Sequence, residues 1–401
     1  MMKRCLPLLL LVLAARGLPA EQFRFKYTPD QKYRILSEVF ESVSINGVFS
    51  HQANILNKIA VETLAVKEAS GLLSCTFQTS ERAFGARSSF ELSEDYPSVF
   101  WRDELGRYAI DPAYFMPVVR NVPTFPREDV PQGGTWSAAG EEVHDLRRSF
   151  GVEKAFHFPV KVSYRYAGRE VREGRELAVI EISYTIFHRV EPLPRSARPA
   201  PVRITGTSEQ TYTWDLEKGQ PHSYEESFDF IFHLSDGNFV EYEGTARGTL
   251  IESPKLDKEK AAAEIRRQLE ESGVEDATVK AEDRGVTITL QNIQFPPNSV
   301  LLVEAEKVKL RKIGEILKGY SERDILIAGH TALAGGYSEE DHQSLSEGRA
   351  RAVADYLLAI GALRDKQVTS RGLGHSQPVA DNGSEEGRRL NRRVEITILE
   401  N

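Results

Sequence analysis

The sequence predicts an α+β protein, in which a mostly antiparallel β region precedes an α/β sandwich with helices packed on a mixed sheet. Two observations predict this order. Apolar and polar residues alternate with a period of two through much of residues 21–252, which is typical of strands with one buried and one wet face. Through residues 253–401, segments with helical spacing alternate with short apolar runs, which indicates a sheet covered by helices.

The first 20 residues are typical of a secretory signal peptide. Residues 1–4 are basic, residues 5–15 form a leucine-rich run too short to cross a bilayer comfortably, and small residues follow. Cleavage is expected after Gly17 or Ala20, and a retained membrane anchor is the alternative. No later segment is apolar enough to span a membrane, so we expect the mature protein in the periplasm or cell envelope, with outer-membrane association left open.

The β region carries the clearest strand patterns of the chain. Residues 33–45 and 55–66 favour strands because β-branched residues recur in them, and Asp236-Gly237 offers a hairpin turn. The patterns predict a barrel or a sandwich, with the Pro/Gly-rich segment 123–134 as a candidate boundary between two subdomains. The alternating apolar sets are Phe158, Val160, Val162, Tyr164 and Tyr166; Ile180, Ile182, Tyr184 and Ile186; Tyr212, Trp214 and Leu216; and Phe228, Phe230, Phe232 and Leu234.

Composition and cysteine usage exclude several classes of function. A formal net charge of -8 gives no basic field that would recruit nucleic acid or an anionic membrane. Of the two cysteines, Cys5 precedes the apolar run, so the mature chain keeps Cys75 alone, without an internal disulfide or a site of several thiolates. Cys75 lies in an apolar run and is predicted to be buried. Hydrolase, P-loop and dinucleotide motifs do not occur, so we expect a non-catalytic protein without a cofactor.

The C-terminal region follows a pattern of alternating helices and short strands. A helix rich in Ala, Glu and Lys is closed by Gly273, which is a typical C-cap residue. The predicted helices are 255–272, 298–319 and 344–360, and the predicted strands are 277–281, 285–290, 325–328, 367–372 and 393–399.

Arg349 is the side chain that most needs a partner. The helix that begins near Ser344 opens with Ser-Leu-Ser-Glu, a capping box, and Arg349 lies on its apolar stripe, four residues from Leu345 and from Val353. The predicted position is also close to the N-terminus of the helix, where the macrodipole disfavours a cation. A guanidinium keeps its proton, so a semi-buried one requires an anion. An internal carboxylate, exposure to solvent or an external carboxylate ligand would each meet this requirement.

The loop before this helix favours the external ligand. Residues 329–331 (Gly-His-Thr) leave a strand, and Gly335 and Gly336 let the backbone approach a ligand closely. Exposed backbone N–H groups beside an oriented arginine make a carboxylate site. Residues 391–393 (Asn-Arg-Arg) add donors at the start of the last strand.

Short motifs occur in a specific order between residues 286 and 398. They are Ile293-x-Phe295, Gly329-His330-Thr331, Leu345-Ser346-x-x-Arg349-Ala350-x-x-Val353, Gly372-x-Gly374 followed by Pro378, and Asn391-Arg392-Arg393-Val394. In these motifs the region resembles the OmpA C-terminal family, which includes peptidoglycan-associated lipoproteins and flagellar motor stator proteins. The resemblance implies a non-catalytic domain that binds the diamino acid of the peptidoglycan stem peptide, with Arg349 holding a carboxylate of that residue.

The resemblance also implies which residues contact peptidoglycan, and where this chain departs from the family. The family's usual Asp, which binds the ligand's ammonium group, is replaced by Ala332, and its usual Asn is replaced by His342. Weaker binding or a different diamino acid is therefore expected, unless Glu339, Glu340 or Asp341 supplies the missing carboxylate. The expected contacts are His330, Thr331, Ala332, Leu333, His342, Arg349, Asn391, Arg392 and Arg393.

The same residues allow two other interpretations. In the first, the domain has lost peptidoglycan binding, and the protein is an envelope scaffold that binds another envelope protein through its β-rich region. In the second, His330, His342 and His375 bind zinc. No pair of these histidines has the helical i, i+4 ligand spacing and no thiol or clustered acid completes a set, so no metal is predicted.

Overall fold

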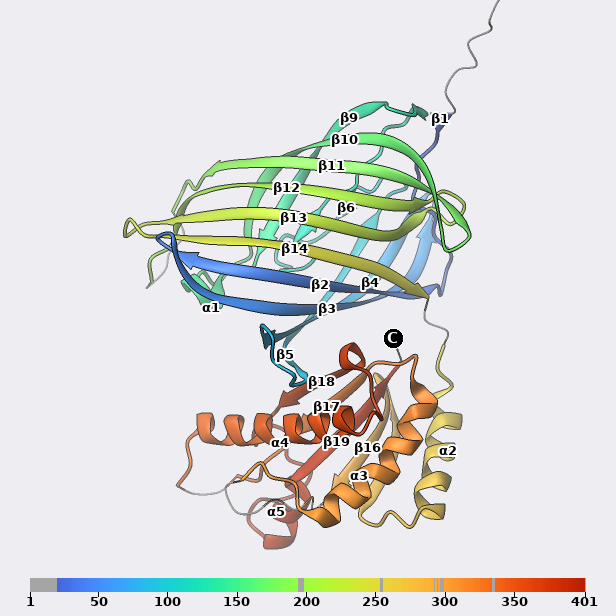
Figure 1. Cartoon of the computed structure of the whole chain (residues 1–401), viewed down its shortest axis with the longest axis vertical. Helices are drawn as coiled ribbons and strands as arrows, with labels where there is room; N and C mark the ends of the chain where they lie inside the picture. The colour runs from blue at the N-terminus through green and yellow to red at the C-terminus, as the bar shows by residue number, and fades with distance from the viewer. Residues whose placement is uncertain are drawn as a thin grey trace, which may run out of the picture.

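The protein consists of a large curved β-sheet and a smaller α/β part that lies against one side of it (Figure 1). This computed structural model describes residues 20–193, 198–252, 255–291, 293, 295, 299–333 and 336–400. The predicted signal peptide, including Gly17 as a cleavage position, lies outside the described residues apart from Ala20. No helix in the described part of the chain is long and apolar enough to cross a membrane.

The predicted antiparallel β region is confirmed. Its strands pair in the spatial order β7-β9-β10-β11-β12-β13-β14-β2-β3-β4-β5-β6, so the last long strand of the region pairs with the first. The sheet curls until β6 and β7 approach each other, where the backbone N–H of Tyr108 donates to Asn121 Oδ1 at 2.8 Å. The bounds are β2 (Lys32–Ile45), β3 (Val48–Lys67), β4 (Ser70–Ala83), β5 (Phe90–Arg102), β6 (Tyr108–Ala109), β7 (Val119–Arg120), β9 (Thr135–His144), β10 (Phe156–Arg172), β11 (Arg175–Arg189), β12 (Pro201–Asp215), β13 (Gln220–Leu234) and β14 (Phe239–Glu252), with the short pair β1 (Ala20–Glu21) and β8 (Val130–Pro131) and the short helix α1 (Arg147–Phe150).

The alternating residues face the inside of the curl, as a period of two requires. All five predicted residues of β10 and all four of β11 are buried, and Trp214 of β12 is completely buried among aromatic rings. Residues 33–45 and 55–66 fall within β2 and β3, and Asp236-Gly237 forms the turn between β13 and β14, with Gly237 at a φ of 90° that only glycine adopts easily. Segment 123–134 buries Phe125 in the same cluster, and its role as a subdomain boundary stays a prediction.

The C-terminal region is a mixed sheet covered by helices, as predicted. The sheet order is β15-β16-β19-β17-β18, with β17 and β18 parallel and the other pairs antiparallel. One hydrophobic cluster lies between this sheet and the helices α2, α3 and α4. The bounds are α2 (Lys258–Glu271), β15 (Ala277–Glu282), β16 (Gly285–Gln291), α3 (Glu304–Leu317), β17 (Ile325–Gly329), α4 (Glu339–Ala359), β18 (Val368–Gly372), α5 (Glu385–Asn391) and β19 (Arg393–Leu399), with single 3₁₀ turns at Lys318–Tyr320 and Asp365–Gln367.

Two predicted helices need correction, and one helix is absent from the prediction. The helix predicted at 298–319 begins only at Glu304, because the chain before it is extended up to the N-cap residue Val303. The helix predicted to begin near Ser344 begins at Glu339. Helix α5 was not predicted, because its seven residues are too few to show a helical period.

Strand β5 joins the two parts of the molecule. It pairs with β4 in the curved sheet and, at its other edge, in parallel with β18, where Thr369 lies opposite Phe90 and Ser370 opposite Glu91. Figure 1 shows β5 reaching from the curved sheet to the C-terminal region. The two sheets are therefore continuous through one strand.

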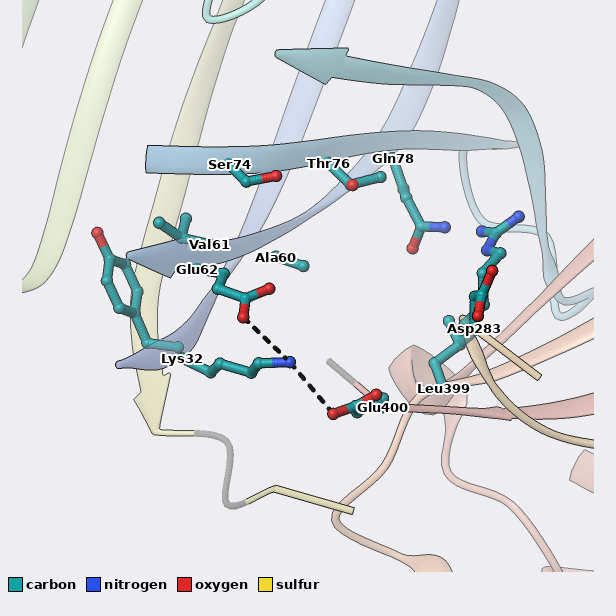
Figure 2. Close-up of a pocket in the computed structure, with 12 residues that line it drawn as sticks. Lys32, Ala60, Val61, Glu62, Ser74, Thr76, Gln78, Asp283, Leu399 and Glu400 are labelled. Carbon is teal, nitrogen blue, oxygen red and sulfur yellow. Dashed lines mark hydrogen bonds and ion pairs between the residues drawn. The ribbon is translucent and has the colours of Figure 1, made fainter. Parts of the chain in front are cut away.

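Charged side chains support this junction. Asp324 forms ion pairs with Arg34 Nη1 at 2.7 Å and with Lys58 Nζ at 3.2 Å, and all three side chains are buried. Beside them, a cavity of about 230 Å³ opens between the two parts. Figure 2 shows Lys32 of β2 between Glu62 of β3, at 3.6 Å, and Glu400 near the end of the chain, at 3.2 Å.

Candidate functional site

Helix α4 carries Arg349 and begins earlier than its sequence suggests. Ser338 is the N-cap residue: its hydroxyl accepts from the backbone N–H of Asp341, whose carboxylate accepts from the backbone N–H of Ser338, at 3.1 and 2.8 Å. The capping box predicted at Ser344 is therefore wrong, because an equivalent pair lies six residues upstream. Arg349 lies in the middle of the helix, so the helix macrodipole does not explain its need for an anion.

Arg349 is a partly buried cation without an acidic partner in the described part of the chain. Its guanidinium lies 4.9 Å from the ring centre of Phe295, and its Nε donates to the carbonyl of Ser299 at a long 3.4 Å. Burial lowers the pKa of the guanidinium, and the nearby charge of Arg392 lowers it further. Both effects disfavour the charged form, so an anion at this position would relieve them.

The loop after β17 is held by buried hydrogen bonds. The backbone N–H of His330 donates to the carbonyl of Arg393 at 3.0 Å, and that of Thr331 donates to the carbonyl of Gly374 at 2.8 Å. The Thr331 hydroxyl and His342 Nδ1 share a hydrogen bond of 3.1 Å, so the loop is joined to α4. The loop and the helix that the sequence placed together therefore do meet.

His330 and Arg393 lie on either side of Glu395. His330 Nε2 is 3.4 Å and Arg393 Nε is 2.7 Å from the Glu395 carboxylate. Burial would raise the pKa of this carboxyl, but His330 and Arg393 outweigh it and hold the pKa at about 2. Both basic residues are thus engaged by an internal acid, while His330 Nδ1 and Arg393 Nη1 are buried without a hydrogen-bond partner among the described residues.

Asn391 and Arg392 also have internal partners. The Asn391 side chain accepts from the backbone N–H groups of Val379 and Ala380 and donates to the Ala380 carbonyl, at 2.8 to 3.0 Å. Arg392 donates to Glu385 of α5 at 2.7 Å and stays partly exposed. Asn391 therefore holds the 379–382 loop in place, whereas Arg392 adds positive charge beside Arg349.

Ala332 stands where the family resemblance leads us to expect an Asp, and its side chain carries no charge. Ala332 is buried, while the next residue, Leu333, is half-exposed and donates its N–H to Asn382 Oδ1 at 3.1 Å. Asp341 is occupied by its capping role, and Glu339 and Glu340 lie exposed on the first turn of α4. Among the described residues, no acidic side chain takes the place of the expected carboxylate at Ala332.

Two features of the site escaped the sequence-based prediction. Phe295 provides a ring under Arg349, and His375 packs edge-on against His342 with ring centres 4.8 Å apart. The only sequence signals were the position of Phe295 in a short motif and the presence of His375 after Gly374. No group of three potential metal ligands occurs among the described residues.

Comparisons with known proteins match this part of the chain. The OmpA family profile matches residues 294–392. Outer membrane porin F of Pseudomonas aeruginosa is 33% identical over 107 residues, covering 27% of this chain and 30% of that protein. Peptidoglycan-binding protein ArfA of Mycobacterium tuberculosis is 38% identical over 106 residues, covering 26% of this chain and 32% of that protein.

A solved structure described as the cell wall anchor of the T6SS from Pseudomonas aeruginosa is 26% identical to this chain. It covers 34% of this chain and 97% of its own, with a TM-score of 0.29. The chain thus spans about a third of the length of the two curated relatives, and the matches fall in its last third. Residues 294–392 of this protein are an OmpA-family domain.

Proposed function

We propose that this is a non-catalytic protein of the cell envelope whose OmpA-family domain binds peptidoglycan through the diamino acid of the stem peptide. Relatives of this domain include proteins whose names place them in the outer membrane or on peptidoglycan. In this proposal the protein lies in the periplasm or at the outer membrane, and an envelope protein contacts its β region.

The observation that carries the proposal is the unpaired charge of Arg349. Phe295 contacts the guanidinium and the charge of Arg392 repels it, so an external carboxylate at Arg349 would gain two parallel hydrogen bonds and offset this repulsion. Other buried basic groups of the domain, such as Arg393, already have an acid. A ligand carboxylate is the missing partner of Arg349.

Ala332 sets the strength of the proposed binding. Without a carboxylate at this position, one charged hydrogen bond to the ligand ammonium is absent, which weakens binding by about 1.5 to 3 kcal/mol. That loss corresponds to a factor of about ten to more than a hundred in the dissociation constant. We therefore propose weak binding, or binding to a cell wall with a different diamino acid.

The test is co-sedimentation of the full-length protein with purified peptidoglycan sacculi of two types, one with diaminopimelate and one with lysine. We expect the wild-type protein to sediment with at least one type and Arg349→Ala to stay in the supernatant. Arg267→Ala is the matched control, because Arg267 is an exposed arginine on α2 with only local ion pairs. Failure of the wild type to sediment with either type would refute peptidoglycan binding.

The Ala332→Asp variant tests the second half of the site. The new carboxylate would be buried without a charged partner in the free protein, so we expect lower stability of the free domain. Bound diaminopimelate would supply the missing ammonium, so we expect tighter binding to diaminopimelate sacculi. Equal or weaker binding of this variant would place the ligand's ammonium elsewhere.

The alternative function is an envelope scaffold that has lost peptidoglycan binding. Two observations favour this function. Ala332 lacks the carboxylate that would bind the ligand's ammonium group, and the β5–β18 pairing attaches the domain directly to the β region rather than through a flexible linker. Absence of sedimentation together with recovery of an envelope protein on the β region would favour this function.

A further inference from the structure

The curled β-sheet contains a cavity of about 290 Å³. All residues that line it belong to the β region, whereas Arg349 belongs to the C-terminal region. Its wall is mostly apolar and comes from β2, β3, β4, β5, β12, β13 and the segment around Met116, with Ile59, Leu73, Phe77 and Phe100 among the lining residues. Clefts that hold small ligands start at about 300 Å³ and are mostly apolar with a few placed polar groups. The cavity therefore has the size and lining of a site for a small apolar molecule.

Arg102 places a positive charge in this wall. Ser98, Phe100 and Arg102 alternate along β5, so the arginine shares the inner face of the strand with two buried residues. Its Nε donates to the hydroxyl of Tyr27 at 2.9 Å, and its guanidinium lies 3.9 Å from the ring centre of Phe25. These contacts hold one edge and one face of the guanidinium, and Arg102 lines the cavity together with Phe25 and Tyr108.

Arg102 has no carboxylate within ion-pair distance among the residues that the structure describes. Buried basic groups elsewhere in the molecule do have one: Lys58 pairs with Asp324 at 3.2 Å, and Arg120 approaches Glu141 at 3.8 Å. A charge inside a protein is costly unless an opposite charge or full hydrogen bonding compensates it. The phenols of Tyr27, Tyr33 and Tyr108 face Arg102, and Tyr33 also shares a hydrogen bond with it. Burial raises the pKa of Tyr27 to about 12 and raises that of Tyr33 as well, so these two phenols are neutral at neutral pH and do not supply an anion at this wall.

The acid in the cavity wall is not that anion. Glu226 accepts at Oε1 from the hydroxyl of Ser208 at 2.7 Å and from Gln210 Nε2 at 3.0 Å. Burial raises the pKa of the Glu226 carboxyl, although these two hydrogen bonds act in the opposite direction. Glu226 thus has its own donors, and it does not cancel the charge of Arg102.

We propose that this cavity binds a small amphipathic monocarboxylic acid, with its carboxylate on Arg102 and its hydrocarbon chain along the apolar wall. A planar carboxylate matches the two terminal N–H groups of a guanidinium, and the aliphatic and aromatic lining matches a chain of a few carbons. The inference concerns the β region alone and does not rest on the proposed binding of peptidoglycan.

The test is isothermal titration calorimetry of the full-length protein with octanoate, and with 1-octanol as the ligand of the same chain without the charge. We expect octanoate to bind at least tenfold more tightly than octanol. Arg102→Met keeps the length of the side chain and removes the charge, and it should weaken octanoate binding at least tenfold. Arg107→Met is the matched control, since Arg107 is exposed on the following turn.

A second variant covers the case in which Arg102→Met does not fold. Ile59→Phe adds volume at the cavity wall and leaves Arg102 in place, so it should also lose octanoate binding while circular dichroism stays that of the wild type. Octanol binding as tightly as octanoate, or Arg102→Met binding octanoate normally, would overturn the role of Arg102. No binding of octanoate to the wild type at millimolar concentration would overturn the site itself.

Discussion

The buried ion group at Asp324 gives the sharpest test of how the two parts of the molecule are held together. Asp324 precedes β17 of the C-terminal region, whereas Arg34 and Lys58 lie on β2 and β3 of the curved sheet. Arg34 and Lys58 also donate to the carbonyls of Glu322 and Gln367, at 3.0 and 3.1 Å. The substitution Asp324→Asn keeps the size of the side chain and removes the only negative charge of this group.

The expected cost follows from burial. Arg34, Lys58 and Asp324 are each at most 9% exposed, so loss of the acid leaves two cations facing each other with little solvent to separate them. Removing one partner of a buried pair typically costs about 3 to 5 kcal/mol. Burial and the charge of Arg34 already lower the pKa of Lys58, so its ammonium can lose its proton once Asp324 is gone. We therefore expect about 3 kcal/mol, the lower end of this range.

Urea unfolding followed by two probes measures this cost. The three tryptophans, Trp101, Trp136 and Trp214, all lie in the β region, whereas helical circular dichroism reports mainly on the C-terminal helices. In the wild type we expect the two probes to change together. In Asp324→Asn the C-terminal transition should move to lower urea and separate from the tryptophan signal.

Asp365→Asn is the control, because Asp365 forms an exposed ion pair with Arg82 across the same junction at 2.6 Å. An exposed pair contributes about 0 to 1 kcal/mol. If Asp324→Asn costs no more than Asp365→Asn, and its two transitions stay together, then the buried group does not couple the two parts.

Three further predictions concern the stability of the C-terminal region. The pKa of Glu395 is about 2 in the folded protein, below its ordinary value of 4.5, so its stabilising effect is complete above pH 4.5 and is lost as the pH falls towards 2; Glu395→Gln should remove about 1 to 3 kcal/mol at pH 6 and flatten this pH dependence in thermal unfolding. Gly285→Ala should lower the free energy of unfolding by at least about 1 to 3 kcal/mol, because Gly285 has a φ of 152° and an added Cβ would lie 1.9 Å from the carbonyl oxygen of Ile398 in β19. An unchanged urea midpoint would contradict this. Ser338→Ala should cost about 1 kcal/mol through loss of the N-cap of α4, whereas Ser344→Ala should cost less if the helix begins where the structure places it.

The sequence predicts the elements of this fold well because their signals are local. The period of two in β10 and β11 and the helical spacing after residue 253 both follow from which side chains face a core. The pairing of β2 with β14 and of β5 with β18 joins residues far apart in the chain. No local pattern contains that information, so the sequence left barrel and sandwich open.

The candidate site was predictable in its main residue and less so in its surroundings. The apolar stripe of its helix singles out Arg349, which has no acidic partner in the part of the chain that the structure describes, but it lies in the middle of the helix rather than near its N-terminus. Asn391 and Arg393 are predicted to add donors to the site; the structure gives them internal partners, a neighbouring loop and Glu395, and their contact with a ligand stays a prediction. Such internal partners cannot be distinguished from ligand contacts until the fold brings them together.

The pairing of β14 with β2 also constrains the order in which the molecule can fold. Strand β2 forms a hairpin with β3 at once, but its other edge waits for β14, whose residue Val240 lies opposite Ile45. The chain must therefore emerge to about residue 252 before the curled sheet can be completed, and β5 stays with an open edge until β18 is made. Pairings between distant strands form slowly, and meanwhile the unpaired edges of β2 and β5 stay exposed and prone to aggregation. Newly made chains of this protein should therefore depend on a chaperone that shields these two edges.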